Sequence, residues 1–61
     1  MEKIYFQYWL HHSGKFNFRI RDTASNHNLT ATRQGYENEA DCISTMRLIN
    51  PRAEIIKVDA P

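Results

Sequence analysis

The sequence predicts a small α+β domain in the order β-β-β-α-β: a three-stranded antiparallel meander, one helix packed on the sheet and a short C-terminal strand. Two segments near the N-terminus alternate between apolar and polar residues, as strands with one buried face do. A later segment has apolar residues at helical spacing, and a β-branched segment follows it. At 61 residues the chain has room for one domain, residues 1–61.

The first two predicted strands cover residues 3–10 and 15–21, and together they form a hairpin. Between them, Gly14 can adopt the positive φ that a tight turn requires. Because successive strand residues point to opposite faces, one face of the hairpin is expected to be buried. That face carries Phe6, Tyr8, Phe16, Phe18 and Ile20.

A third strand is predicted over residues 29–34, "LTATRQ", which are rich in β-branched types, and Gly35 is expected to end it. Tyr36 is then expected to pack at the corner between strand and helix. The last strand is predicted over residues 53–58, "AEIIKV". It either completes the same sheet or pairs with a second copy, since an open edge invites pairing.

The helix is predicted from Glu39 to about Ile49. Asn38 is a suitable N-cap, and acidic residues in the first turn face the positive end of the helix dipole. The helix is expected to end before Pro51, because the residue preceding a proline is pushed out of the helical region. The expected apolar stripe consists of Ala40, Ile43, Met46 and Ile49, with Cys42 beside it.

Size and composition restrict the classes of function. A chain this short buries only about 60% of its extended surface, so a lone monomer is marginally stable. Cys42 is the only cysteine, so no disulfide can form within the chain, and a metal or a partner subunit is the remaining reinforcement. The sequence shows no signal-like or membrane-spanning apolar run, and we expect a cytoplasmic protein without membrane contact.

The net charge of +1 divides unevenly along the chain. Residues 1–36 carry five basic and two acidic residues, a net charge of +3, whereas residues 37–61 carry three basic and five acidic residues, a net charge of −2. Such an asymmetry can guide association between copies. It is too weak to identify a nucleic-acid-binding protein, for which a strongly basic domain is expected.

Three blocks, "GKFNFRIR", "ATRQGY" and "NEADC", in that order and followed by "NP" and "PRAEI", resemble the DUF1508 family, also called UPF0339 or YegP-like. The resemblance extends from Phe6 to Ile55, with a longer loop at residues 22–28 and Glu39 where the family has a basic residue. The matching positions are Gly14, Phe16, Phe18, Arg19, Ile20, Arg21, Ala31, Thr32, Gly35, Tyr36, Asn38 and Ala40. The resemblance implies a sheet-plus-helix unit that, as a single unit, forms a homodimer. It implies no established activity, cofactor or ligand.

The face of the hairpin opposite the core is the main candidate site. We expect it to expose Tyr5, Trp9, Lys15, Arg19 and Arg21. Aromatic and cationic side chains of this kind are favoured at protein interfaces, which is the interpretation that we prefer, with a second copy as partner. The alternative is weak binding of single-stranded nucleic acid or another anion, through base stacking and phosphate contacts.

Metal binding and catalysis have little support in the sequence. The candidate ligands are His11, His12, His27 and Cys42, and none of them has the spacing that brings ligands together. His11 and His12 would point to opposite faces of a continuing strand. No catalytic motif is present, so we expect a non-catalytic protein without a cofactor.

Overall fold

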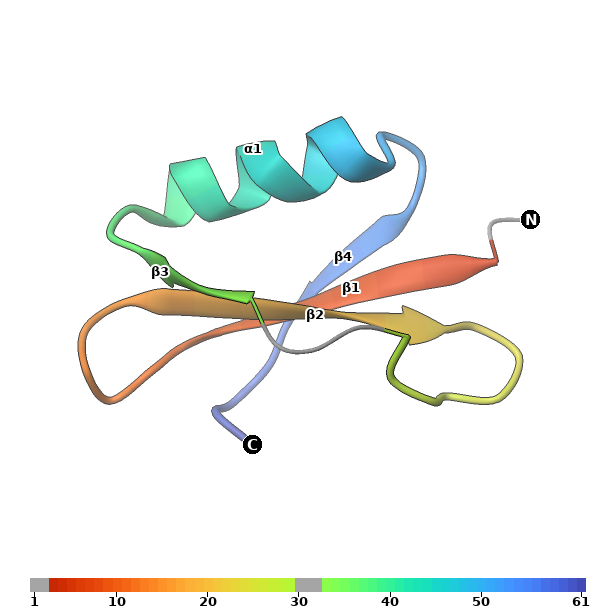
Figure 1. The fold of residues 1–61 in the computed structure, drawn as a ribbon, viewed down its shortest axis with the longest axis horizontal. Coiled ribbons are helices and arrows are strands. Elements are labelled where there is room, and N and C mark those ends of the chain that lie inside the picture. The colour runs from red at the N-terminus through yellow and green to blue at the C-terminus, as the bar shows by residue number, and fades with distance from the viewer. Residues whose placement is uncertain (1–2, 30–32) are drawn as a thin grey trace.

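The computed structural model describes residues 3–29 and 33–61, with the backbone alone described for Arg33 and Gln34. The helix α1 lies across one face of the sheet (Figure 1). The elements in chain order are β1 (Ile4–Leu10), β2 (Phe16–Asp22), β3 (Arg33–Tyr36), α1 (Glu39–Ile49) and β4 (Glu54–Lys57). The predicted α+β class and the order β-β-β-α-β are confirmed. No helix among the described residues is long and apolar enough to cross a membrane.

The four strands form one mixed sheet with the order β3-β2-β1-β4. β1 pairs with β2, and β2 with β3, in antiparallel directions as expected, but β4 runs parallel to β1 from Tyr5↔Glu54 to Tyr8↔Lys57. The direction follows from the crossover: α1 carries the chain back along the sheet, so the next strand must run in the direction of β1. The last strand therefore completes its own sheet.

The third strand begins and ends later than predicted. It covers Arg33–Tyr36 and contains Gly35, which was expected to end it. The register with β2 shifts between the pairs Phe16↔Tyr36 and Phe18↔Arg33. Over this stretch β3 therefore contains one residue more than β2. This is a β-bulge, and Gly35 with φ +101° takes up the extra residue. Of the predicted strand, Thr30, Ala31 and Thr32 lie outside the described residues.

The core lies between the sheet and α1. Phe6 and Phe18 meet edge to face, with ring centroids 6.0 Å apart. Of the five side chains predicted to be buried, Phe6, Tyr8 and Phe18 are buried, and Phe16 and Ile20 are partly buried against them. The helix and the segment after it add Cys42, Met46 and Ala53.

The helix has the predicted bounds, but its buried face differs from the predicted stripe. Cys42 and Met46 are buried, whereas Ala40 is exposed and Ile49 keeps 49% of its surface exposed. The physical reason is that a repeat of three residues advances by less than one turn of about 3.6 residues, so such a stripe drifts around the helix. Residues spaced by four stay over the sheet.

Both ends of α1 lie where the sequence predicts. Asn38 has the extended backbone of an N-cap, but its side chain makes no capping hydrogen bond and instead donates from Nδ2 to Oδ2 of Asp41 at 3.2 Å. Asn50, before Pro51, is extended with φ −154° and ψ 101°, as the proline requires. Tyr36, immediately before this corner, packs on Phe18 with ring centroids 5.9 Å apart.

Candidate functional site

The sheet face away from α1 brings most of the predicted surface residues together. Cross-strand pairing places Tyr5 beside Arg21, Gln7 beside Arg19 and Trp9 beside Asn17. Because these residues alternate with the buried Phe6, Tyr8 and Phe18, their side chains lie on the opposite face. We call Tyr5, Gln7, Trp9, Asn17, Arg19 and Arg21 the open-face cluster.

Trp9 was expected to be exposed, and this expectation is wrong. Only 3% of its surface is accessible, although it lies outside the core between sheet and helix. The guanidinium of Arg19 lies over its ring, 5.5 Å from the centroid, which is a cation–π arrangement. The hydrogen bonds between β1 and β4 continue beyond β4, since Val58 N–H donates to the backbone carbonyl of Tyr8, the residue before Trp9, at 2.8 Å. The chain after β4 then ends on the side of the sheet away from α1 (Figure 1).

The two arginines of the cluster are bound within the molecule. Gln7 Oε1 accepts from Arg19 Nε at 2.8 Å and from Arg21 Nη1 at 3.4 Å. A hydrogen bond joins Arg21 to the backbone carbonyl of Asn26, whose side chain accepts from the hydroxyl of Tyr5 at 2.9 Å. These contacts fix the loop after β2 against the open face. Among the described residues, Arg21 Nε is a buried polar atom without a hydrogen bond.

Lys15, the fifth predicted surface residue, lies apart from these arginines at the turn between β1 and β2. Gly14, in the same turn, has φ +89°, as predicted. The Lys15 ammonium is 3.8 Å from Oε1 of Glu37, and both side chains are at least half exposed. An exposed pair at this distance holds its partners weakly.

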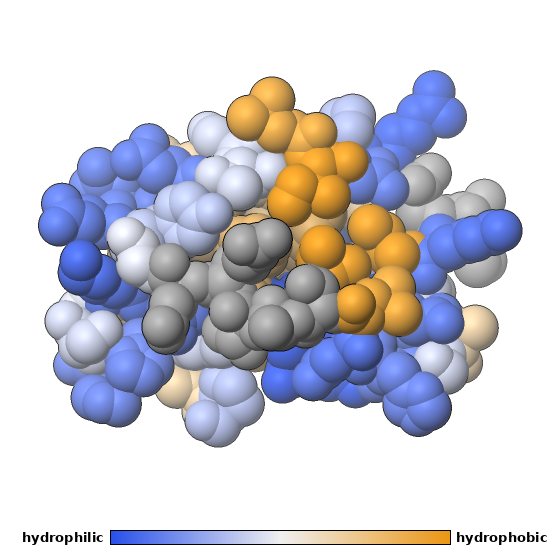
Figure 2. Space-filling model, viewed as in Figure 1, coloured by the Kyte–Doolittle hydropathy of each residue, from blue (hydrophilic) through white to orange (hydrophobic). Residues whose placement is uncertain are grey.

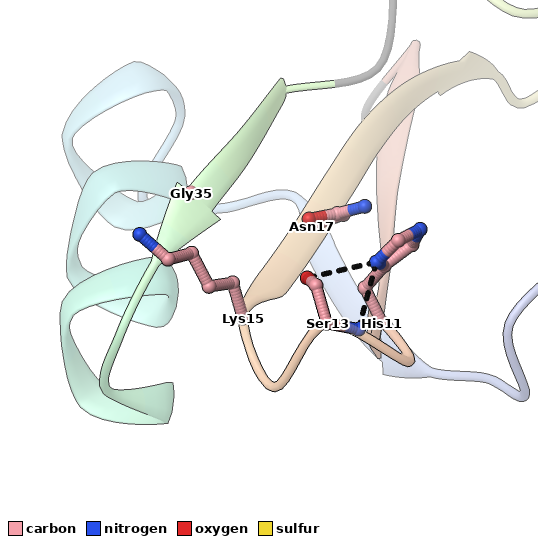
Figure 3. Close-up of a pocket in the computed structure, with 5 residues that line it drawn as sticks. All are labelled: His11, Ser13, Lys15, Asn17 and Gly35. Atoms are coloured by element: carbon pink, nitrogen blue, oxygen red, sulfur yellow. Dashed lines mark hydrogen bonds between the residues drawn. The ribbon is translucent and has the colours of Figure 1, made fainter.

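A shallow hollow of about 320 Å³ lies beside this turn, lined by His11, Ser13, Lys15, Asn17 and Gly35. In Figure 3 the Asn17 side chain lies between Gly35 of β3 on one side and the His11 ring on the other. Ser13 Oγ is 2.9 Å from His11 Nδ1, and the backbone N–H of Ser13 donates to the same nitrogen at 3.1 Å.

A polar chain that the sequence analysis missed joins the sheet to the helix. The hydroxyl of Tyr8 donates to Oε2 of Glu39 at 2.7 Å, and the same oxygen lies 3.4 Å from the ammonium of Lys57. The hydrogen bond to Glu39, with burial, raises the pKa of Tyr8 to about 12. The Tyr8 hydroxyl lowers the pKa of Glu39, and Lys57 lowers it further. In the sequence, the acidic Glu39 in the first turn of the helix was the one residue that could have indicated this contact.

The residues considered for metal binding do not form a site. The strand ends at Leu10, so the alternation expected for His11 and His12 does not apply, and their rings lie side by side with centroids 3.8 Å apart. Within residues 3–29 and 33–61, no three His, Cys, Asp or Glu side chains gather as a metal site requires. Cys42 is buried in the core, and burial raises its pKa to about 11.

The outer surface carries several apolar side chains. Figure 2 shows hydrophobic side chains gathered in a band that runs from the helix layer at the top of the view down toward the sheet layer. The most exposed large hydrophobic residues among those described are Leu10 at 52%, Leu29 at 53%, Leu48 at 86% and Ile49 at 49%. Leu48 and Ile49 form the end of α1, and Leu29 is bonded through its backbone N–H to Ile20 of β2 at 2.8 Å.

Comparisons with known proteins add no assignment. Neither a scan against models of protein families nor searches of curated proteins and of solved structures found a match.

Proposed function

We propose that the chain is a small non-catalytic module that acts through protein–protein contacts and that its first partner is a second copy of itself. The observation that supports this proposal most is the exposure of Leu48, which leaves 86% of a leucine in solvent at the end of a helix. Leu29 and Ile49 are also about half exposed. Figure 2 shows hydrophobic side chains gathered on one side of the molecule, and a gathered apolar surface is typical of interaction sites.

Two further features support a second copy as the partner. The sheet has two edges, β3 and β4, each of which pairs with one neighbour among the described strands. Open edges of this kind can pair with another chain. A chain of 61 residues also gains the most from association, because its own core is small.

The open-face cluster supports the alternative, binding of single-stranded nucleic acid, less well. Base stacking requires an accessible aromatic face, and only 3% of Trp9 is accessible. Arg19 and Arg21 already donate hydrogen bonds to the side-chain oxygen Oε1 of Gln7. We therefore rank protein contacts first.

The proposal extends to family and location. We propose that residues 1–61 form a single DUF1508-like unit, on the strength of the three sequence blocks that resemble that family. We also propose a cytoplasmic location, because one unpaired thiol suits a reducing compartment.

A pair of helix variants tests the proposed surface. Leu48→Glu places a charge at the most exposed leucine, and Ser44→Glu places the same charge one turn earlier at another exposed position of α1. We expect Leu48→Glu to weaken self-association by at least tenfold in sedimentation equilibrium and Ser44→Glu to leave it unchanged. If both variants self-associate as strongly as the wild type, the interface lies elsewhere on the molecule. A wild type that stays monomeric would contradict the proposal.

A further inference from the structure

We draw no further inference here: the strongest candidate, the open edge of the sheet at β4, where the backbone groups of Ile55 and Lys57 point away from β1, carries none beyond the proposed function, because nothing in the part of the chain that the structure describes shows what covers it.

Discussion

The hydroxyl of Tyr8 in β1 donates a hydrogen bond to Glu39 at 2.7 Å and so connects β1 to the first turn of α1. Tyr8 is 6% exposed and belongs to the core, whereas the side chain of Glu39 is 42% exposed. Lys57 of β4 approaches the same carboxylate oxygen at 3.4 Å. One glutamate at the start of α1 therefore contacts both β1 and β4.

Removing the hydroxyl tests this connection. We expect Tyr8→Phe to lower the free energy of unfolding by about 1 kcal/mol, because one hydrogen bond to a partly exposed carboxylate is lost without a cavity. Tyr36→Phe is the matched control, since the Tyr36 hydroxyl makes no hydrogen bond with described residues, and it should change stability by only a few tenths of a kcal/mol. Urea unfolding followed by circular dichroism measures both. Equal effects would contradict the role given to Glu39.

The same bond makes stability depend on alkaline pH. The pKa of Tyr8 is raised from 10.0 to about 12 in the folded protein, so the folded state holds this proton more tightly than the unfolded state. Its stabilising contribution is complete below the unfolded value and declines as pH rises from about 10 to about 12. The stability difference between wild type and Tyr8→Phe should therefore shrink over this interval. A difference that stays constant in urea unfolding at neutral pH and at about pH 11 would contradict it.

Two helix positions test the position of the core. Met46 is fully buried, whereas Leu48, on the same helix, is 86% exposed. We expect Met46→Ala to cost about 2–5 kcal/mol, because it removes buried methylene groups and leaves a cavity. Leu48→Ala should change the stability of the isolated protomer by less than about 0.5 kcal/mol. Similar losses in thermal or urea unfolding would show that α1 is rotated relative to the sheet.

Trp9 is the single tryptophan and reports on the open-face cluster directly. We expect a blue-shifted emission and little quenching by iodide in the folded protein, because only 3% of the residue is accessible. Arg19→Met should lower stability by about 0.5–1 kcal/mol through loss of the cation–π contact. Emission of an exposed tryptophan in the folded wild type would contradict the burial and restore the stacking interpretation.

Local patterns predicted most of the elements. Alternation over residues 3–10 and 15–21 indicated β1 and β2 because a half-buried strand leaves this signature, and proline chemistry indicated the end of α1. β3 was misplaced because a bulge allows Gly35 to lie inside a strand, where composition alone suggests a break. The parallel direction of β4 depends on the path of the whole chain, which no local pattern records.

The candidate site was predicted only in part. Cross-strand register could be inferred from the hairpin, so Tyr5, Trp9, Arg19 and Arg21 were correctly expected to share one face. The exposure of these side chains could not be inferred in the same way. It depends on side-chain contacts, such as the guanidinium of Arg19 over the Trp9 ring and the hydrogen bonds from both arginines to Gln7. The hollow at Asn17 depends on the bulge and was not predicted for the same reason as β3.

The solution mass is the most direct test of the proposed function. Light scattering over a dilution series, at low and at high salt, should give twice the 7.2 kDa of one chain and should remain there at high salt, because an apolar interface is little screened. A mass of 7.2 kDa at every concentration would contradict association between copies. Dissociation by salt alone would contradict the apolar interface and favour one between the oppositely charged halves of the chain.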